Sequence, residues 1–173
     1  MLTQEVTVQF IKHTENWVKG ESFEGGMLFI FGLFLLILAF YFWRLAHLPY
    51  FKALIVPFLV VGLLWSAAAG IGLYQNTNRL EKFRAEYEKN PSEFIRSEKD
   101  RVEGFSKWYR PLLISWSLLI IAGLAIFHFG GGNHGRAIGA AVIMFALTLL
   151  MIDHTSENNA QMYQAEIIKA LEE

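Results

Sequence analysis

The 173-residue chain contains no cysteine. This absence excludes disulfide bonds, thiolate metal sites and cysteine nucleophiles, and it removes the usual indicator of the redox compartment. The chain also lacks an excess of charge of either sign, because its formal net charge is −1. Neither a nucleic acid nor an acidic surface is therefore indicated as a partner.

Charged residues are also missing from four long apolar runs, residues 25–43, 53–74, 111–129 and 137–152. At about 1.5 Å per helical residue, each run crosses or nearly crosses a hydrocarbon core of about 30 Å. Hydrophobic residues make up 54% of the chain, more than a soluble domain usually carries. The sequence therefore predicts an all-α polytopic membrane protein, with a four-helix transmembrane bundle in a single domain over residues 1–173.

An even number of spans places both termini and residues 75–110 on one side of the membrane. All 16 acidic residues lie on that side, together with every lysine and arginine except Arg44, Lys52 and Arg136. The positive-inside rule then predicts cytoplasmic termini, and we expect a protein of a bacterial inner membrane. The segment before the first run lacks the pattern of a secretory signal, so we expect it to be retained.

Three segments outside the spans have helical periodicity. Leu2, Val6, Phe10 and Trp17 form one apolar stripe, which predicts an interfacial amphipathic helix over residues 1–24. The spacing on either side of Asn90 and Pro91 predicts a cytoplasmic helical hairpin over residues 75–110, with Asn90 as an N-cap. A weaker stripe predicts a cytoplasmic C-terminal helix over residues 153–173.

One candidate site lies just beyond the fourth run, where His154 and Glu157 share a helical face. A histidine and a glutamate at this spacing can supply two metal ligands, or a base with its orienting carboxylate. Glu98, Arg101 and Glu103 of the predicted hairpin lie on the same side of the membrane and could complete such a site. The alternative is that Asp153 and Ser156 cap a helix junction while the other acidic residues face water.

A second candidate site lies on the opposite side, where His47, His128 and His134 stand near the ends of the runs. Three imidazoles can bind zinc or copper, although these separations lack the spacing of a paired ligand motif. Isolated histidines at the membrane surface are the alternative interpretation. The sequence identifies no cofactor.

The spans lack the ionisable groups that coupled transporters and proton pumps generally need. Small residues, including the pairs Ser66/Gly70, Ala68/Gly72 and Gly135/Gly139, predict close helix packing within the bundle or between copies of the chain. We therefore favour an accessory, assembly or regulatory subunit over an enzyme, with the lipid bilayer and a membrane protein or a second copy as partners. Two alternatives stay open: a membrane-embedded enzyme or an amphiphile- or metal-binding protein that uses the cytoplasmic His/Glu cluster, and a passive oligomeric pore.

Overall fold

The computed structural model describes residues 4–172, with side chains from Phe10 onward. This part of the chain forms five helices and no strand: α1 (Gln4–Leu45), α2 (Pro49–Lys89), α3 (Pro91–Ser106), α4 (Tyr109–Phe129) and α5 (Gly132–Glu172). The four apolar runs lie in α1, α2, α4 and α5, which are long and apolar enough to cross a membrane. The predicted all-α architecture with four spans is confirmed, and the chain is an integral membrane protein.

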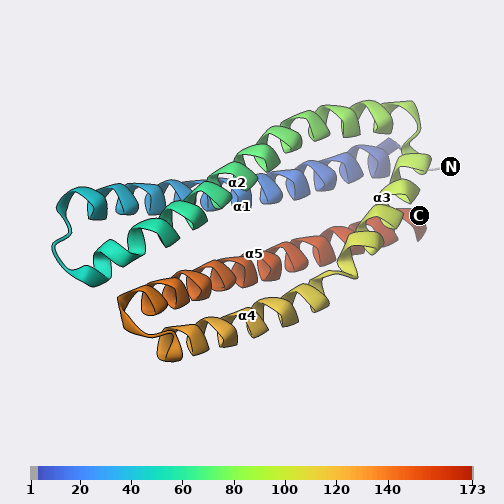
Figure 1. The fold of residues 1–173 in the computed structure, drawn as a ribbon. Coiled ribbons are helices and arrows are strands. Elements are labelled where there is room, and N and C mark those ends of the chain that lie inside the picture. The colour runs from blue at the N-terminus through green and yellow to red at the C-terminus, as the bar shows by residue number, and fades with distance from the viewer. Residues whose placement is uncertain (1–3, 173) are drawn as a thin grey trace.

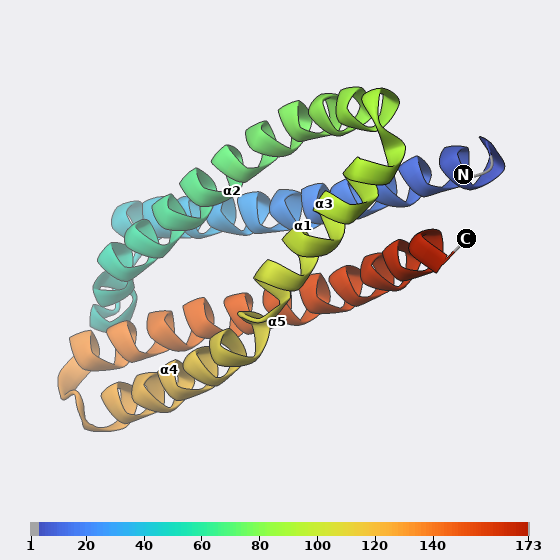
Figure 2. The same cartoon turned by 90° about the vertical axis from the view of Figure 1, so that its right-hand side faces the viewer.

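The spans are arranged as two antiparallel hairpins, α1 with α2 and α4 with α5 (Figure 1). Helix α5 joins the hairpins because it packs against both α1 and α2, whereas α4 packs mainly against α5. Figure 2 shows α4 at the outer edge of the molecule. Its outward side chains, including Ile114, Leu118 and Ile121, are exposed and would face lipid.

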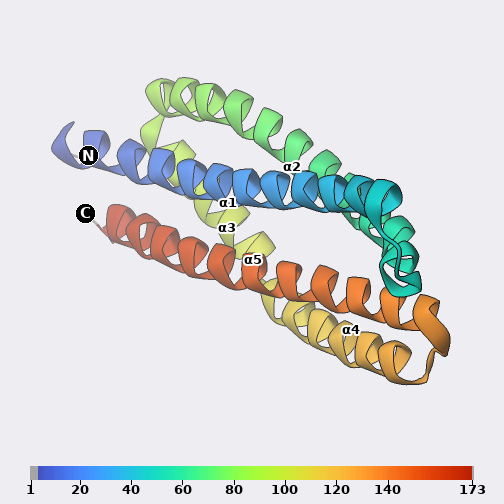
Figure 3. The same cartoon turned by 90° about the vertical axis from the view of Figure 1, so that its left-hand side faces the viewer.

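The long helices exceed the thickness of a membrane. Helix α1 has 42 residues, so it is about 63 Å long against a hydrocarbon core of about 30 Å. The parts of α1, α2 and α5 that extend beyond the apolar runs lie at the end of the molecule that holds both termini and α3 (Figure 3). We call this end the terminal bundle, comprising residues 10–24, 75–110 and 153–172, and we call the opposite end, with residues 44–52 and 130–136, the loop end.

The terminal bundle has its own hydrophobic core. Phe10 and Trp17 of α1 are only 2% and 6% exposed, and they pack in one cluster with residues of α2, α3 and α5. Helices α3 and α5 supply aromatic partners that remove both residues from water. The interfacial position of this helix stays a prediction. The helix is also continuous with the first span. Leu2 and the side chain of Val6 lie outside the described part of the chain.

The predicted helical arms on either side of Asn90 are confirmed. The backbone N–H of Glu93 donates to the Asn90 Oδ1 atom at 3.3 Å, and the Asn90 side-chain amide donates to the Glu93 carboxylate at 3.0 Å. This reciprocal cap starts α3 directly after α2 ends. The first arm is not a separate helix, because α2 runs unbroken from Pro49 to Lys89. The C-terminal segment is likewise the continuation of α5.

Close packing within the membrane depends on glycine. A Cβ atom added at Gly32 of α1 would lie 2.6 Å from the Ser66 Oγ atom of α2, and one added at Gly139 of α5 would lie 2.4 Å from the backbone nitrogen of Phe127 in α4. Gly72 of α2, by contrast, has no such neighbour within 4 Å. Ser66 and Gly139 therefore bring helices of the same chain together, as small residues do in membrane bundles.

Candidate functional site

An ion pair in the terminal bundle joins a buried carboxylate to a partly exposed arginine, both on α3. Glu98 of α3 is 2% exposed, and the Arg101 guanidinium donates to its two carboxylate oxygens at 2.7 and 2.6 Å. The Tyr163 hydroxyl of α5 donates to the same carboxylate at 2.9 Å. The Thr14 hydroxyl of α1 lies 2.9 Å from the Tyr163 hydroxyl, and it also donates to the Phe10 carbonyl oxygen at 3.4 Å. These bonds tie α1, α3 and α5 together.

Aromatic rings surround this ion pair. The Arg101 guanidinium carbon lies 4.4 Å from the Trp17 ring centroid, and the Trp17 and Tyr163 rings stack at 5.5 Å. Burial, and then the neighbouring Glu98, raise the pKa of the Tyr163 hydroxyl well above its usual range. The hydroxyl therefore stays protonated and remains a hydrogen-bond donor. This geometry suits a fixed link between helices better than a group that exchanges protons.

The structure brings together only part of the predicted His/Glu cluster. Glu98 and Arg101 pair with each other, whereas Glu103 pairs with Lys99 at 3.7 Å. The Glu157 carboxylate accepts a 3.5 Å hydrogen bond from Gln161, one turn further along α5.

His154 is exposed, and within residues 4–172 no hydrogen bond or ion pair joins it to Glu98, Arg101 or Glu103. A catalytic or ligand-binding role for this cluster stays a prediction.

The alternative interpretation of this region, a helix junction capped by Asp153 and Ser156, is wrong because α5 passes through both residues unbroken. Their side chains instead join helices. The Trp116 indole of α4 donates to the Asp153 carboxylate, and the Ser156 hydroxyl donates to the Glu21 carboxylate of α1 at 2.9 Å. The first bond lies within the α4–α5 hairpin, and the second joins this hairpin to α1.

The three histidines of the second candidate site lie at the loop end. His47 is in the connection between α1 and α2, His128 is near the end of α4, and His134 is in the first turn of α5. All three are exposed. Across the described residues, no group of three or more His, Asp or Glu side chains is placed to hold a metal ion. A metal at either candidate site therefore stays a prediction without an assembled set of ligands.

Glu24 was not among the predicted site residues, although its environment is unusual. It is 9% exposed, and the Asn159 side-chain amide donates to it at 2.7 Å. Burial, followed by repulsion from Glu21, raises the pKa of Glu24 to about 7, with a smaller contribution from Asp153. The sequence did indicate that these carboxylates could lie close together, because Glu24 directly precedes the first apolar run and Asp153 directly follows the fourth.

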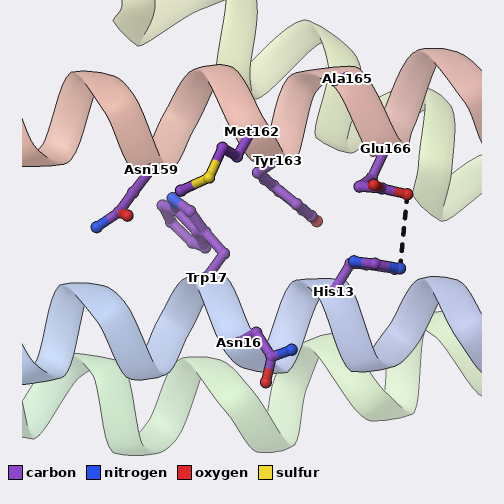
Figure 4. A pocket seen from close by; sticks show the side chains of 8 residues that line it. All are labelled: His13, Asn16, Trp17, Asn159, Met162, Tyr163, Ala165 and Glu166. Atoms are coloured by element: carbon purple, nitrogen blue, oxygen red, sulfur yellow. Dashed lines mark ion pairs between the residues drawn. The ribbon is translucent and has the colours of Figure 1, made fainter.

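A groove of about 410 Å³ separates α1 from α5 in the terminal bundle (Figure 4). His13 and Glu166 form a 3.5 Å ion pair across it, and Met162 reaches from α5 toward Trp17. The Trp17 Nε1 atom is buried and has no hydrogen-bond partner among the residues that the structure describes. Sequence reasoning could not find this groove, because it depends on how closely α1 and α5 approach each other.

We call the groove between α1 and α5 the Trp17 groove, and we call the hydrogen bonds around the Glu98 carboxylate the Glu98 network. No relative indicates what either one binds. Comparisons of the chain with models of protein families, with curated proteins and with solved structures find no match.

Proposed function

We propose that this chain is a small integral membrane accessory or assembly subunit whose terminal bundle binds a protein partner in the groove between α1 and α5. The observation that supports this proposal concerns Trp17, which lines the groove and whose buried Nε1 atom has no acceptor among the described residues. A buried donor without an acceptor costs about 1–3 kcal/mol. A partner that moves the covering side chains aside and places a carbonyl or carboxylate oxygen beside the Nε1 atom would recover that free energy.

The groove has the composition of a protein interface. Its centre is apolar, with the Trp17 ring and the Met162 side chain, while His13, Asn16 and Glu166 supply polar groups around it. An apolar centre with a polar rim is the usual arrangement at protein–protein contacts. Met162 is 64% exposed, and its flexible thioether can move aside to admit a partner side chain.

We further propose that the terminal bundle lies in the cytoplasm and that the membrane is a bacterial inner membrane. Of the lysines and arginines, only Arg44, Lys52 and Arg136 lie at the loop end. This asymmetry supports cytoplasmic termini. A helical bundle also fits an inner membrane, since proteins that span bacterial outer membranes are typically β-barrels.

Site-specific photocrosslinking in intact membranes tests the proposal. A photoreactive amino acid at Met162 should give one defined heterologous product, whereas the same amino acid at Asp100, an exposed residue of α3 outside the groove, should not. The partner is identified by mass spectrometry of the product. The absence of a defined product at Met162, or the same product at both positions, would contradict the proposal.

Trp17→Phe then tests the role of the N–H group, since it keeps an aromatic ring at this position, although the phenyl ring is smaller than the indole that packs against Tyr163 and Arg101. We expect at least tenfold weaker partner binding and a modest fall in the thermal midpoint, because removal of the unsatisfied donor offsets only part of the packing that the smaller ring loses. A variant that binds the same partner with unchanged affinity would show that Trp17 does not donate to it.

A further inference from the structure

A second, apolar groove lies at the loop end, on a different face from the Trp17 groove. It has a volume of about 650 Å³ and separates α2 from the α4–α5 hairpin. The lining residues used below are Lys52, Val56 and Leu64 of α2, Leu119 of α4, and His134 and Phe145 of α5. All except Lys52 and His134 belong to the apolar runs, so the groove opens sideways into the hydrocarbon region.

The depth of the groove matches one leaflet of a bilayer. Along α2 it extends from Lys52 to Leu64, which is about 18 Å at 1.5 Å per residue. Half of a hydrocarbon core of about 30 Å is about 15 Å. The groove therefore runs from the membrane surface at the loop end to about the middle of the bilayer.

The mouth of the groove is positively polarised. Among the described side chains, Lys52 and His134 are its ionisable lining residues, and none of the acidic ones lines it. Helices α2 and α5 both begin at this end, at Pro49 and Gly132, so the positive ends of their dipoles lie near the mouth. Pro57, a lining residue without an N–H group, leaves the Ala53 carbonyl without its usual helical donor. The mouth thus offers the Lys52 ammonium and the His134 imidazole as donors to an anion.

We infer that this groove binds an anionic phospholipid from the loop-end leaflet, with the phosphate at Lys52 and His134 and one acyl chain along Val56 toward Leu64 and Phe145. The size of the groove favours a single acyl chain over a helix. A helix about 10 Å wide and 18 Å long displaces about 1,400 Å³, more than twice the volume available. A volume of 650 Å³ is instead within the range of small-molecule sites. The inference is independent of the proposed partner groove.

Native mass spectrometry of the purified full-length chain tests the inference. The chain is equilibrated with equimolar phosphatidylglycerol and phosphatidylcholine that carry the same acyl chains. We expect one phosphatidylglycerol per chain, retained at least tenfold in preference to phosphatidylcholine. In the double variant Lys52→Gln/His134→Gln, retention of phosphatidylglycerol should fall to the level of phosphatidylcholine.

Arg44→Gln is the matched control. Arg44 is also a cation of the loop end, but it lies over the rings of Trp43 and Phe40 and does not line the groove. This variant should retain phosphatidylglycerol as the unchanged chain does. If Arg44→Gln and the double variant lose phosphatidylglycerol equally, the lipid is attracted to any cation at the loop end. This result would overturn the inference.

Val56→Trp tests the apolar part of the site. Val56 is 66% exposed, so a larger side chain can fill the groove without disturbing the helix core. We expect the variant to keep its helicity and to lose the bound lipid. Retained lipid in this variant, equal retention of the two lipids by the unchanged chain, or a dimer without lipid would each overturn the inference.

Discussion

Glu98 and Glu24 are two carboxylates of the terminal bundle that the fold removes from water in different ways. Glu98 receives hydrogen bonds from the Arg101 guanidinium and the Tyr163 hydroxyl. Glu24 receives one neutral donor, Asn159, and lies near other acidic groups. The first carboxylate should therefore contribute mainly to stability, and the second should make stability depend on pH.

Removing the charge of Glu98 should destabilise the chain strongly. In Glu98→Gln the Arg101 cation loses its ionic partner inside the bundle, so we expect the free energy of unfolding in detergent to fall by about 3 kcal/mol. Lys82→Gln, which breaks the exposed pair between Lys82 and Glu86, should cost less than about 1 kcal/mol. Equal losses of stability in the two variants would show that the pair with the buried Glu98 carboxylate contributes no more to stability than an exposed pair does.

Protonation of Glu24 should stabilise the fold. Its pKa is about 7 in the fold against an ordinary value of 4.5, so the folded chain binds more protons between these two values. The resulting stability is fully present below pH 4.5 and is lost as the pH rises through 7, with a limit of about 3 kcal/mol.

Thermal midpoints measured between pH 5 and 8 should therefore fall with pH in the unchanged chain and fall less in Glu24→Gln. The neighbouring carboxylates Glu21 and Asp153 are present in both proteins, so the difference isolates Glu24. Glu88→Gln, which alters an exposed glutamate, should behave as the unchanged chain does. Parallel pH profiles for all three proteins would contradict the assignment to Glu24.

At the scale of the helix, the sequence predicted what local patterns encode. The four apolar runs and the cap formed by Asn90 and Glu93 depend on residues close together in the chain, and the structure confirms both. The stripe with Phe10 and Trp17 was predicted to be a helical face but was assigned to the membrane surface. Periodicity shows that a face is apolar, but it does not show whether lipid or protein covers that face.

The contact between α4 and α5 gives a prediction at this scale. In Gly139→Ala the new Cβ atom would meet the backbone of Phe127 at 2.4 Å, so the two helices must separate, at a cost of about 1–3 kcal/mol. Gly72→Ala adds the same methyl group where no such neighbour lies within 4 Å, and it should be neutral or stabilising by up to about 1 kcal/mol. Thermal midpoints of the two variants in detergent check this difference, and a loss in Gly72→Ala equal to that in Gly139→Ala would contradict it.

At the scale of the whole molecule, helix α5 joins the two hairpins through contacts that span most of the chain. Thr14 meets Tyr163 and Glu24 meets Asn159, pairs that are 149 and 135 residues apart. No local pattern specifies such pairs, so neither the Glu98 network nor the Trp17 groove could be predicted as an assembled site. Glu98 and Arg101 were candidates individually, and their mutual pairing follows from the i, i+3 spacing on α3.

The proposed orientation can be tested cleanly because the chain has no cysteine. Single cysteines replace His47, at the loop end, and Lys169, in the terminal bundle; both residues are exposed. A membrane-impermeant maleimide should label His47→Cys in intact cells and Lys169→Cys only after lysis. The opposite pattern would place the termini outside the cytoplasm, and labelling of both cysteines in intact cells would contradict an even number of spans.

The central claim is that the terminal bundle binds a protein partner through the Trp17 groove. Native mass spectrometry of the chain extracted with its surrounding lipids tests this claim most directly. The account predicts a complex with one defined second polypeptide, which Trp17→Phe weakens and which Asp100→Asn, an exposed change outside the groove, does not. A folded chain that is recovered without any other polypeptide, under conditions in which known membrane complexes survive, would contradict it.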